Sequence, residues 1–188
     1  MSAARREAGR ATERGPERRL LLLRHAKSDW SAEGHDDHER PLSRRGRRAA
    51  KQIGEELARR RIAPERILCS SARRTRETLE LVRPHLHGDA ALVVDQHLYL
   101  ASPETLLAQI ADVDDGVRTL LVVGHNPGLE ELACQLAGRG DEEALARLKR
   151  KFPTGALADL RFAADRWREL APASGVLAAF VWPRELDG

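Results

Sequence analysis

The sequence has few cysteines and few aromatic residues: two cysteines are present in 188 residues, and Phe, Trp and Tyr together make up 4%. Cys69 and Cys134 are too few for the disulfide framework of a small secreted domain, so we expect both to be reduced. Long apolar runs are also lacking. The run Leu20 to Leu23 is shorter than the roughly seven apolar residues of a signal peptide, and no stretch reaches the roughly 18 of a membrane span. We therefore expect a cytoplasmic protein with no membrane partner.

Most of the chain lacks an excess of charge of either sign. The net charge is +3, and residues 1–19 alone contain six arginines and three glutamates, so the remaining residues are balanced. This N-terminal segment shows no apolar periodicity, which predicts a disordered basic leader over 1–19 and a single domain over 20–188. We expect no nucleic-acid partner. The alternative, nucleic-acid binding by the leader, predicts salt-dependent binding that is lost when residues 1–19 are deleted.

What the sequence does contain is an alternation of apolar runs and amphipathic segments. The predicted strands cover 20–24, 66–70, 91–95, 118–123, 156–163, 166–171 and 176–182, and the predicted helices cover 43–61, 73–86, 103–112, 127–138 and 141–150. This order predicts an α/β fold of three layers, in which a mostly parallel sheet has helices on both faces and the last strands add an antiparallel edge. The length suffices for one such domain with a substantial core.

Two of the predicted strands are followed by a histidine. Arg24 and His25 come directly after the leucine run, and Gly124 and His125 follow the apolar strand at 118–123. Open α/β sheets bind ligands at the carboxyl ends of their strands, so both histidines can converge on one pocket. A neutral imidazole is a nucleophile at neutral pH and its cation binds an oxyanion, so the pair suits phosphate chemistry.

Arginines accompany these histidines. Arg40 lies shortly before Ser43, the expected N-cap of a helix, and Gly46 would let that helix lie close to the sheet. Arg73 and Arg74 lie at the start of the next predicted helix, where an anion is favoured. Phosphoryl transfer is catalysed mostly by positioning the substrate and stabilising its negative charge with cations. The planar guanidinium of arginine can bind two phosphoryl oxygens at once.

Together these segments resemble the histidine phosphatase superfamily, the phosphoglycerate-mutase-like group, and within it the small bacterial protein-phosphohistidine phosphatases. The similar segments occur in the family's order at 24–30, 37–46, 70–78 and 123–128, and the similarity extends from about Leu20 to Pro183.

The resemblance implies a role for each site residue. His25 would be the nucleophile that accepts the phosphoryl group, and the groups that hold the phosphoryl oxygens would be Arg24, Arg40, Arg74 and His125. Arg74 is preferred because the family's arginine stands four residues after the serine that closes the strand, here Ser70. Arg73 is the alternative.

The sequence departs from the family in two respects. Ala26 and Lys27 stand where most members have glycine and many have an acid, although Ala-Lys-Ser is familiar in the small bacterial branch. In addition, no clear counterpart exists for the glutamate that protonates the leaving oxygen in mutases and ester phosphatases. The candidates to replace it are Asp29, Asp37, Asp95 and Glu104.

A missing general acid favours a substrate whose leaving group departs easily, and phosphohistidine fits that description. We therefore predict a phosphatase that acts through a phosphohistidine enzyme intermediate on protein phosphohistidine. The nearest alternative is a phosphatase of small phosphate esters or anhydrides. An alternative of another class is an inactive phosphate-binding or interaction module.

Two other motifs are weaker. His35, Asp36, Asp37 and His38 resemble metal ligands, but in this family they fall in the loop that leads to Arg40, so we expect a metal-independent enzyme without a cofactor. A cysteine phosphatase needs an arginine six residues after its cysteine, and Thr75 stands there relative to Cys69.

Overall fold

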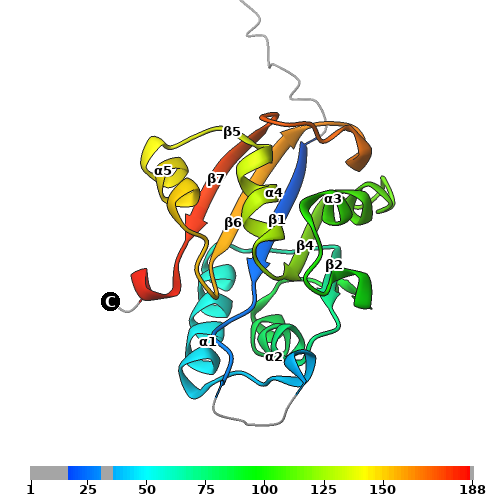
Figure 1. The fold of residues 1–188 in the computed structure, drawn as a ribbon. Coiled ribbons are helices and arrows are strands. Elements are labelled where there is room, and N and C mark those ends of the chain that lie inside the picture. The colour runs from blue at the N-terminus through cyan, green and yellow to red at the C-terminus, as the bar shows by residue number, and fades with distance from the viewer. Residues whose placement is uncertain (1–16, 31–35, 187–188) are drawn as a thin grey trace, which may run out of the picture.

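The computed structural model describes residues 17–30 and 36–186, which form one sheet between two layers of helices (Figure 1). The strands are β1 (Glu17–Arg24), β2 (Arg66–Ser70), β3 (Ala91–Asp95), β4 (Thr119–Gly124), β5 (Ala137–Gly140), β6 (Leu157–Ala163) and β7 (Gly175–Val181). The helices are α1 (Arg44–Arg59), α2 (Arg73–Val82), α3 (Pro103–Ala111), α4 (Gly128–Leu136) and α5 (Glu142–Arg150). Short 3-10 turns connect several of these elements.

The sheet has seven strands in the order β3-β2-β4-β1-β6-β7-β5. Its first four strands are parallel, β6 runs antiparallel to both β1 and β7, and β5 is parallel to β7. The predicted α/β class is confirmed, with a mostly parallel sheet and antiparallel pairing contributed by the C-terminal strands. Parallel strands must be joined by crossover connections, and the helices α1 to α4 lie in the connections between strands.

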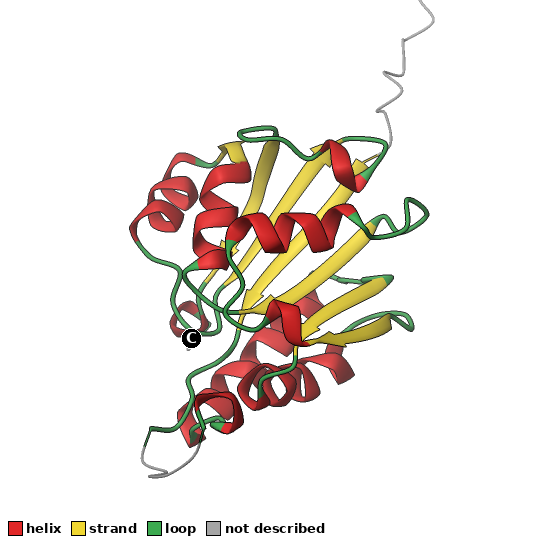
Figure 2. Ribbon diagram, turned by 45° about the vertical axis from the view of Figure 1, so that its right-hand side comes forward, coloured by secondary structure: helices red, strands yellow, loops and turns green. Residues whose placement is uncertain are grey.

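The leucine run in β1 is apolar throughout because this strand is covered on both faces (Figure 2). Leu20 and Leu22 pack in the core layer that also holds residues of α3, α4 and α5. Leu21 and Leu23 point to the opposite face, where they pack with residues of α1 and α2. Alternate side chains of a strand point to opposite faces, so a continuous apolar run marks a central strand.

In the C-terminal half, one predicted strand is wrong and one predicted helix extends too far. The segment 166–171 is not a strand but contains a 3-10 turn, Trp167–Glu169, whose fully buried Trp167 donates from Nε1 to the Val117 carbonyl at 2.9 Å. The predicted helix 127–138 ends at Leu136, and β5 follows it to pair with β7. Gly138 and Gly140 disfavour a helix, and these residues form a strand because they pair with β7.

The predicted boundary of the leader is also wrong at its end, because β1 begins at Glu17. Arg18 is fully buried, donates to the carbonyls of Val117 (2.6 Å) and Asp115 (2.9 Å), and lies over the Trp167 ring. Its apolar stem and the two Nη groups that donate to these carbonyls therefore belong to the fold. Residues 1–16 of the predicted leader lie outside the described residues.

Helix α1 is held against the loop that follows β1. Ser43 is the predicted N-cap: its Oγ accepts from the Gly46 N–H at 3.1 Å and donates to the Lys27 carbonyl at 3.0 Å. A Cβ at Gly46 would lie 2.0 Å from that same carbonyl oxygen. The glycine thus permits a close approach, as predicted, but to the loop after β1 rather than to the sheet.

No helix in the described part of the chain is both long and apolar enough to cross a bilayer.

Candidate active site

His25 and His125 come together at the carboxyl ends of β1 and β4. Arg24 is paired in register with Gly124, so the two histidines follow their strands at the same level, and the His25 N–H donates to the Gly124 carbonyl at 3.0 Å. Their ring centroids are 5.2 Å apart. The two strand ends thus meet in one place, as the sequence pattern predicts.

The ring of His25 is fixed in one orientation. Its Nδ1 lies 2.7 Å from the carbonyl oxygen of Ala26, and because a carbonyl only accepts, Nδ1 carries the proton. The lone pair of the neutral ring is therefore on Nε2. Burial lowers the pKa of His25 to about 3, and the charges of Arg74 and Arg24 act in the same direction. At neutral pH this imidazole is therefore uncharged.

His125 is held by a hydroxyl on one side and has no partner on the other. Its Nε2 lies 2.7 Å from Oγ of Ser70, the last residue of β2, whereas its Nδ1 is buried with no hydrogen-bond partner among the described residues. Burial lowers the pKa of His125 to about 2, and the neighbouring His25 and Arg74 also lower it.

Asp37 anchors two of the arginines expected to hold phosphate. Arg74, buried at the start of α2, donates from Nη1 to the Asp37 carbonyl (2.6 Å) and from Nη2 to its Oδ2 (3.0 Å). Nη2 of Arg40 lies 2.9 Å from Asp37 Oδ1, and the Arg40 guanidinium stacks 3.5 Å over the ring centroid of Trp30. Bidentate and stacked contacts of this kind fix an arginine's orientation.

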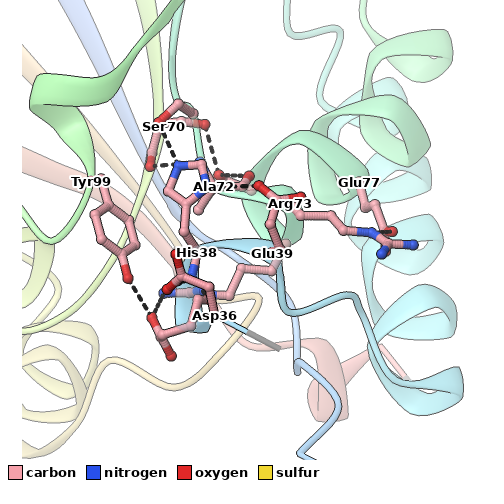
Figure 3. A network of polar contacts seen from close by, with 12 residues as sticks. Asp36, His38, Glu39, Ser70, Ala72, Arg73, Glu77 and Tyr99 are labelled. Atoms are coloured by element: carbon pink, nitrogen blue, oxygen red, sulfur yellow. Dashed lines mark hydrogen bonds and ion pairs between the residues drawn. The ribbon is translucent and has the colours of Figure 1, made fainter. Parts of the chain in front are cut away.

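Tyr99 is a site residue that the sequence analysis missed. Its hydroxyl donates to Asp37 Oδ2 at 2.6 Å, and its ring meets the His125 ring edge-on with centroids 5.4 Å apart. It also meets the His38 ring edge-on, with centroids 4.9 Å apart (Figure 3). The hydrogen bond from Tyr99 is the main cause that lowers the pKa of the Asp37 carboxyl, and Arg74 and Arg40 lower it further. Tyr99 is the sole tyrosine of the sequence and follows β3. Its position after a predicted strand was the feature of the sequence that could have indicated a site residue.

The loop between α5 and β6 closes the site beside Arg24. The Phe152 carbonyl accepts from Nη1 of Arg24 at 2.8 Å and from Nδ2 of Asn126 at 3.0 Å. The Gly155 N–H donates to the His25 carbonyl at 3.0 Å, with Gly155 at φ +77°, a conformation that glycine adopts freely.

Arg73 and Arg74 have different surroundings. Nε of Arg73 donates to Glu77 Oε1 at 2.8 Å, on the side of α2 away from Tyr99 (Figure 3). Its side chain is 42% exposed, compared with 2% for Arg74. Of the two candidates, Arg74 is the one placed beside His125 and Tyr99.

The four groups that act on His25 each have one buried nitrogen atom without a hydrogen-bond partner among the described residues. These atoms are Nε of Arg24, Arg40 and Arg74 and Nδ1 of His125. A buried donor left unpaired costs about 1–3 kcal/mol, and such groups are rare in folded proteins. A bound tetrahedral oxyanion would supply the missing acceptors. The site is therefore suited to hold a phosphoryl group against Nε2 of His25.

Three of the four candidate carboxyl groups have a lowered pKa, which is the opposite of what a general acid needs. The pKa of Asp37 is lowered as described, that of Asp95 is lowered by the backbone N–H and the ring of His97, and that of Glu104 is lowered chiefly by the Ser102 hydroxyl. A carboxyl that donates a proton at neutral pH needs a raised pKa. Asp29, the fourth candidate, is held through its N–H by the Pro41 carbonyl at 2.8 Å.

The residues of the segment 35–38, whose sequence resembles a set of metal ligands, contact other groups in the structure where they are described. Asp36 accepts from the His38 N–H, while the His38 ring lies 2.8 Å from Ser71 Oγ through Nε2 and 2.9 Å from Glu39 Oε1 through Nδ1. His35 lies outside the described residues. Among the residues described, no group of three or more His, Cys, Asp or Glu side chains is arranged to hold a metal ion.

Cys69 is not arranged as a nucleophile. Its thiol is buried, and burial raises its pKa to about 12.

Comparison with known proteins agrees with this geometry. The family model of the histidine phosphatase superfamily (branch 1) matches residues 20–99. A solved structure described as the "putative phosphohistidine phosphatase SixA" of Nakamurella multipartitia superposes with a TM-score of 0.77 at 30% identity, covering 89% of this chain and 96% of that one. The chain belongs to the histidine phosphatase superfamily.

Within the histidine phosphatase superfamily it is similar to the small SixA-like branch. A second structure, described as the "putative phosphohistidine phosphatase SixA" of Agrobacterium tumefaciens, has a TM-score of 0.71 at 33% identity and covers 87% of this chain and 97% of that one. An uncharacterized protein of Mycobacterium tuberculosis is 42% identical over 164 residues, which are 86% of this chain and 100% of the relative.

Proposed function

We propose that this protein is a metal-independent phosphatase that removes the phosphoryl group from phosphohistidine on another protein, through a covalent intermediate on His25. The observation that carries the proposal is the set of unpartnered buried nitrogens on the groups that act on the neutral His25 ring. Its similarity to the structures described as SixA supports the choice of substrate.

In the first step, Nε2 of His25 attacks phosphorus, and the bond between phosphorus and the substrate imidazole breaks. The leaving imidazole departs neutral, with a proton that it already carries or takes from water. Arg24, Arg40, Arg74 and His125 stabilise the oxygens as charge spreads over them. In the second step, water attacks the phosphoryl group on His25 and releases inorganic phosphate, which restores the neutral ring.

The arginines supply the positive charge that a metal ion provides in other phosphatases. Asp37 fixes two of them, so their orientation is set before substrate binds. Asp37, Asp95 and Glu104, three of the four candidate proton donors, have lowered pKa values, and this favours a substrate that leaves as imidazole.

The test is a comparison of kcat/KM for phosphohistidine, an aryl phosphate and phosphoserine. We expect phosphohistidine and the aryl phosphate to react orders of magnitude faster than phosphoserine, because only the leaving group changes among them. Parallel assays in EDTA should give the same rates.

Equal kcat/KM values for phosphoserine and phosphohistidine would contradict the proposed substrate. Asp29→Asn, Asp95→Asn and Glu104→Gln would then locate the proton donor. Loss of activity in EDTA with recovery on adding a divalent ion would contradict metal independence. No turnover of any of the three substrates would favour the inactive phosphate-binding module.

A further inference from the structure

A second pocket lies between α1, the loop before β6 and the segment after β7. Its volume is about 270 Å³, and its lining includes Lys27, Arg45, Lys151 and Arg184 but no acidic residue. We call it the cationic pocket. It is distinct from the phosphoryl site because it contains neither histidine and none of the three arginines described above.

The four cations of the pocket are unpaired. In the ranges 17–30 and 36–186, none of them forms an ion pair with a carboxylate, whereas neighbouring Arg47 pairs with Glu77 at 3.0 Å and Arg147 pairs with Glu185. The Arg184 guanidinium lies 4.5 Å from the centroid of the Trp182 ring. Like charges gathered in one concavity attract anions and concentrate them there.

Uncharged donors complete the lining. Trp182 is 4% exposed, and its Nε1, which can only donate, is buried without a hydrogen-bond partner. Thr154 adds a hydroxyl to the same lining. The lining residues thus include a buried indole whose donor has no partner among the described residues.

The loop from Lys151 to Gly155 borders both the pocket and the phosphoryl site. Phe152 accepts from Arg24 and Gly155 donates to the His25 carbonyl, while Thr154, between them, lines the pocket. Lys27 follows His25 by two residues. A ligand that occupies both the cationic pocket and the phosphoryl site must extend across this loop. A peptide or the surface of a folded protein is large enough to do so.

We propose that the cationic pocket binds acidic side chains that flank the phosphohistidine of the protein substrate. This inference rests on the proposed function and deepens it by naming a feature of the substrate. Carboxylates would pair with these cations, and the exposed position of all four cations suits a protein partner. Such contacts at the rim of an interface act mainly on association.

The experiment uses two phosphohistidine peptides of equal length, one with Asp and Glu around the phosphohistidine and one with Asn and Gln instead. The pocket variant is Arg45→Ser with Lys151→Ser. The matched control is Arg44→Ser with Lys149→Ser, which removes the same charge from exposed positions of α1 and α5 outside the pocket. Affinity for the unphosphorylated acidic peptide and for inorganic pyrophosphate is measured by calorimetry.

We expect the pocket variant to lose about tenfold in kcat/KM on the acidic peptide, through KM, because two weak ion pairs are removed. Turnover of the neutral peptide should be unchanged, and the control variant should change less than about twofold. The pocket variant should also bind the unphosphorylated acidic peptide more weakly.

Equal losses in the pocket and control variants would overturn the proposal, since they would reflect net charge alone. So would a pocket variant that loses affinity for pyrophosphate but not for the acidic peptide, because the ligand would then be a small anion. If the wild type hydrolyses an aryl phosphate but neither peptide, the proposed function fails, and the binding measurement still tests the pocket.

Discussion

At the scale of single residues, the hydrogen bonds of the two histidines leave a different ring nitrogen free in each. Nδ1 of His25 is tied to a carbonyl and leaves Nε2 free, whereas Nε2 of His125 faces a hydroxyl and leaves Nδ1 unpartnered. The free Nε2 of a neutral ring is the group that can attack phosphorus.

His25→Ala should abolish turnover while inorganic phosphate still binds, because the three arginines and His125 remain. Rapid quench of the wild type should trap phosphate on His25 as an acid-labile, base-stable adduct. Calorimetry with phosphate checks the binding arm. An adduct on Cys69 or Ser70, or turnover that persists in the variant, would show that another group is the nucleophile.

Arg74 and Arg73 provide a matched pair for testing the phosphate-holding role. Arg74→Lys should lower kcat/KM by about 10²–10³-fold, because an ammonium cannot keep both contacts to Asp37 and also face the phosphate. Arg73→Lys should stay within about twofold, since that side chain pairs with Glu77 on the surface of α2. Steady-state kinetics on an aryl phosphate measures both; the opposite ranking would assign the role to Arg73.

At the scale of elements, the site depends on how α1 is seated. The Ser43 hydroxyl donates to the Lys27 carbonyl, Gly46 leaves room for that carbonyl, and Ser28 forms a bridge with Leu42. Glu77 of α2 accepts from the Leu42 N–H at 2.8 Å. The loops that carry His25 and Arg40 are thus joined to each other and to both helices on this face.

Gly46→Ala should lower the free energy of unfolding by about 2–3 kcal/mol, because the new Cβ would meet the Lys27 carbonyl and the loop or helix would have to move. Lys51→Ala, at an exposed position of the same helix, should change it by less than about 0.5 kcal/mol. Urea denaturation measures both. Equal stability of the two variants would mean that α1 can shift without cost.

The elements that sequence could predict are those with a strong local pattern. β1 and β4 are apolar runs buried on both faces, and α1 has a cap and a regular apolar stripe, so their positions emerge from periodicity and capping. β5 has no such pattern: its residues Ala137 to Gly140 form a strand because β7 lies beside them. Pairing of this kind depends on tertiary neighbours and cannot be read locally.

The same distinction applies to the site. Arg24, His25 and His125 lie at strand ends, so the sheet rule brings them together. Tyr99 and Asp37 come from loops whose paths are set by long-range contacts, and only the structure shows that they bind each other. Asp37, considered in the sequence as an acid or a metal ligand, is in the structure an anchor for arginines.

At the scale of the whole molecule, two buried neutral histidines make stability depend on pH. The folded-state pKa values of His25 and His125 are lowered to about 3 and about 2, whereas an unfolded histidine titrates near 6.5. Above about pH 6.5 neither state takes up these protons. As the pH falls below that value, the unfolded chain binds protons that the folded protein does not, so stability is lost.

The loss should approach about 1.4 kcal/mol per pH unit for each ring between roughly pH 6 and pH 3. Urea denaturation of the wild type and of His25→Gln with His125→Asn, at several pH values, measures it. The double variant should show a flatter dependence, whereas His87→Gln, at an exposed position, should match the wild type. Identical slopes of the free energy of unfolding against pH in all three proteins would contradict this prediction. They would show that the two rings take up protons as easily in the folded state as in the unfolded chain.

The position of β1 in the middle of the sheet has a consequence for biosynthesis. β1, the first strand of the described residues, pairs with β4 and β6, so Leu20 has Leu120 as its neighbour on one side and Leu160 on the other. Contacts this far apart in sequence form late and slowly. A nascent chain that ends before β4 has neither neighbour for the strand that carries His25. His25 therefore reaches its final environment only after most of the polypeptide has been translated, and truncated translation products lack the assembled site.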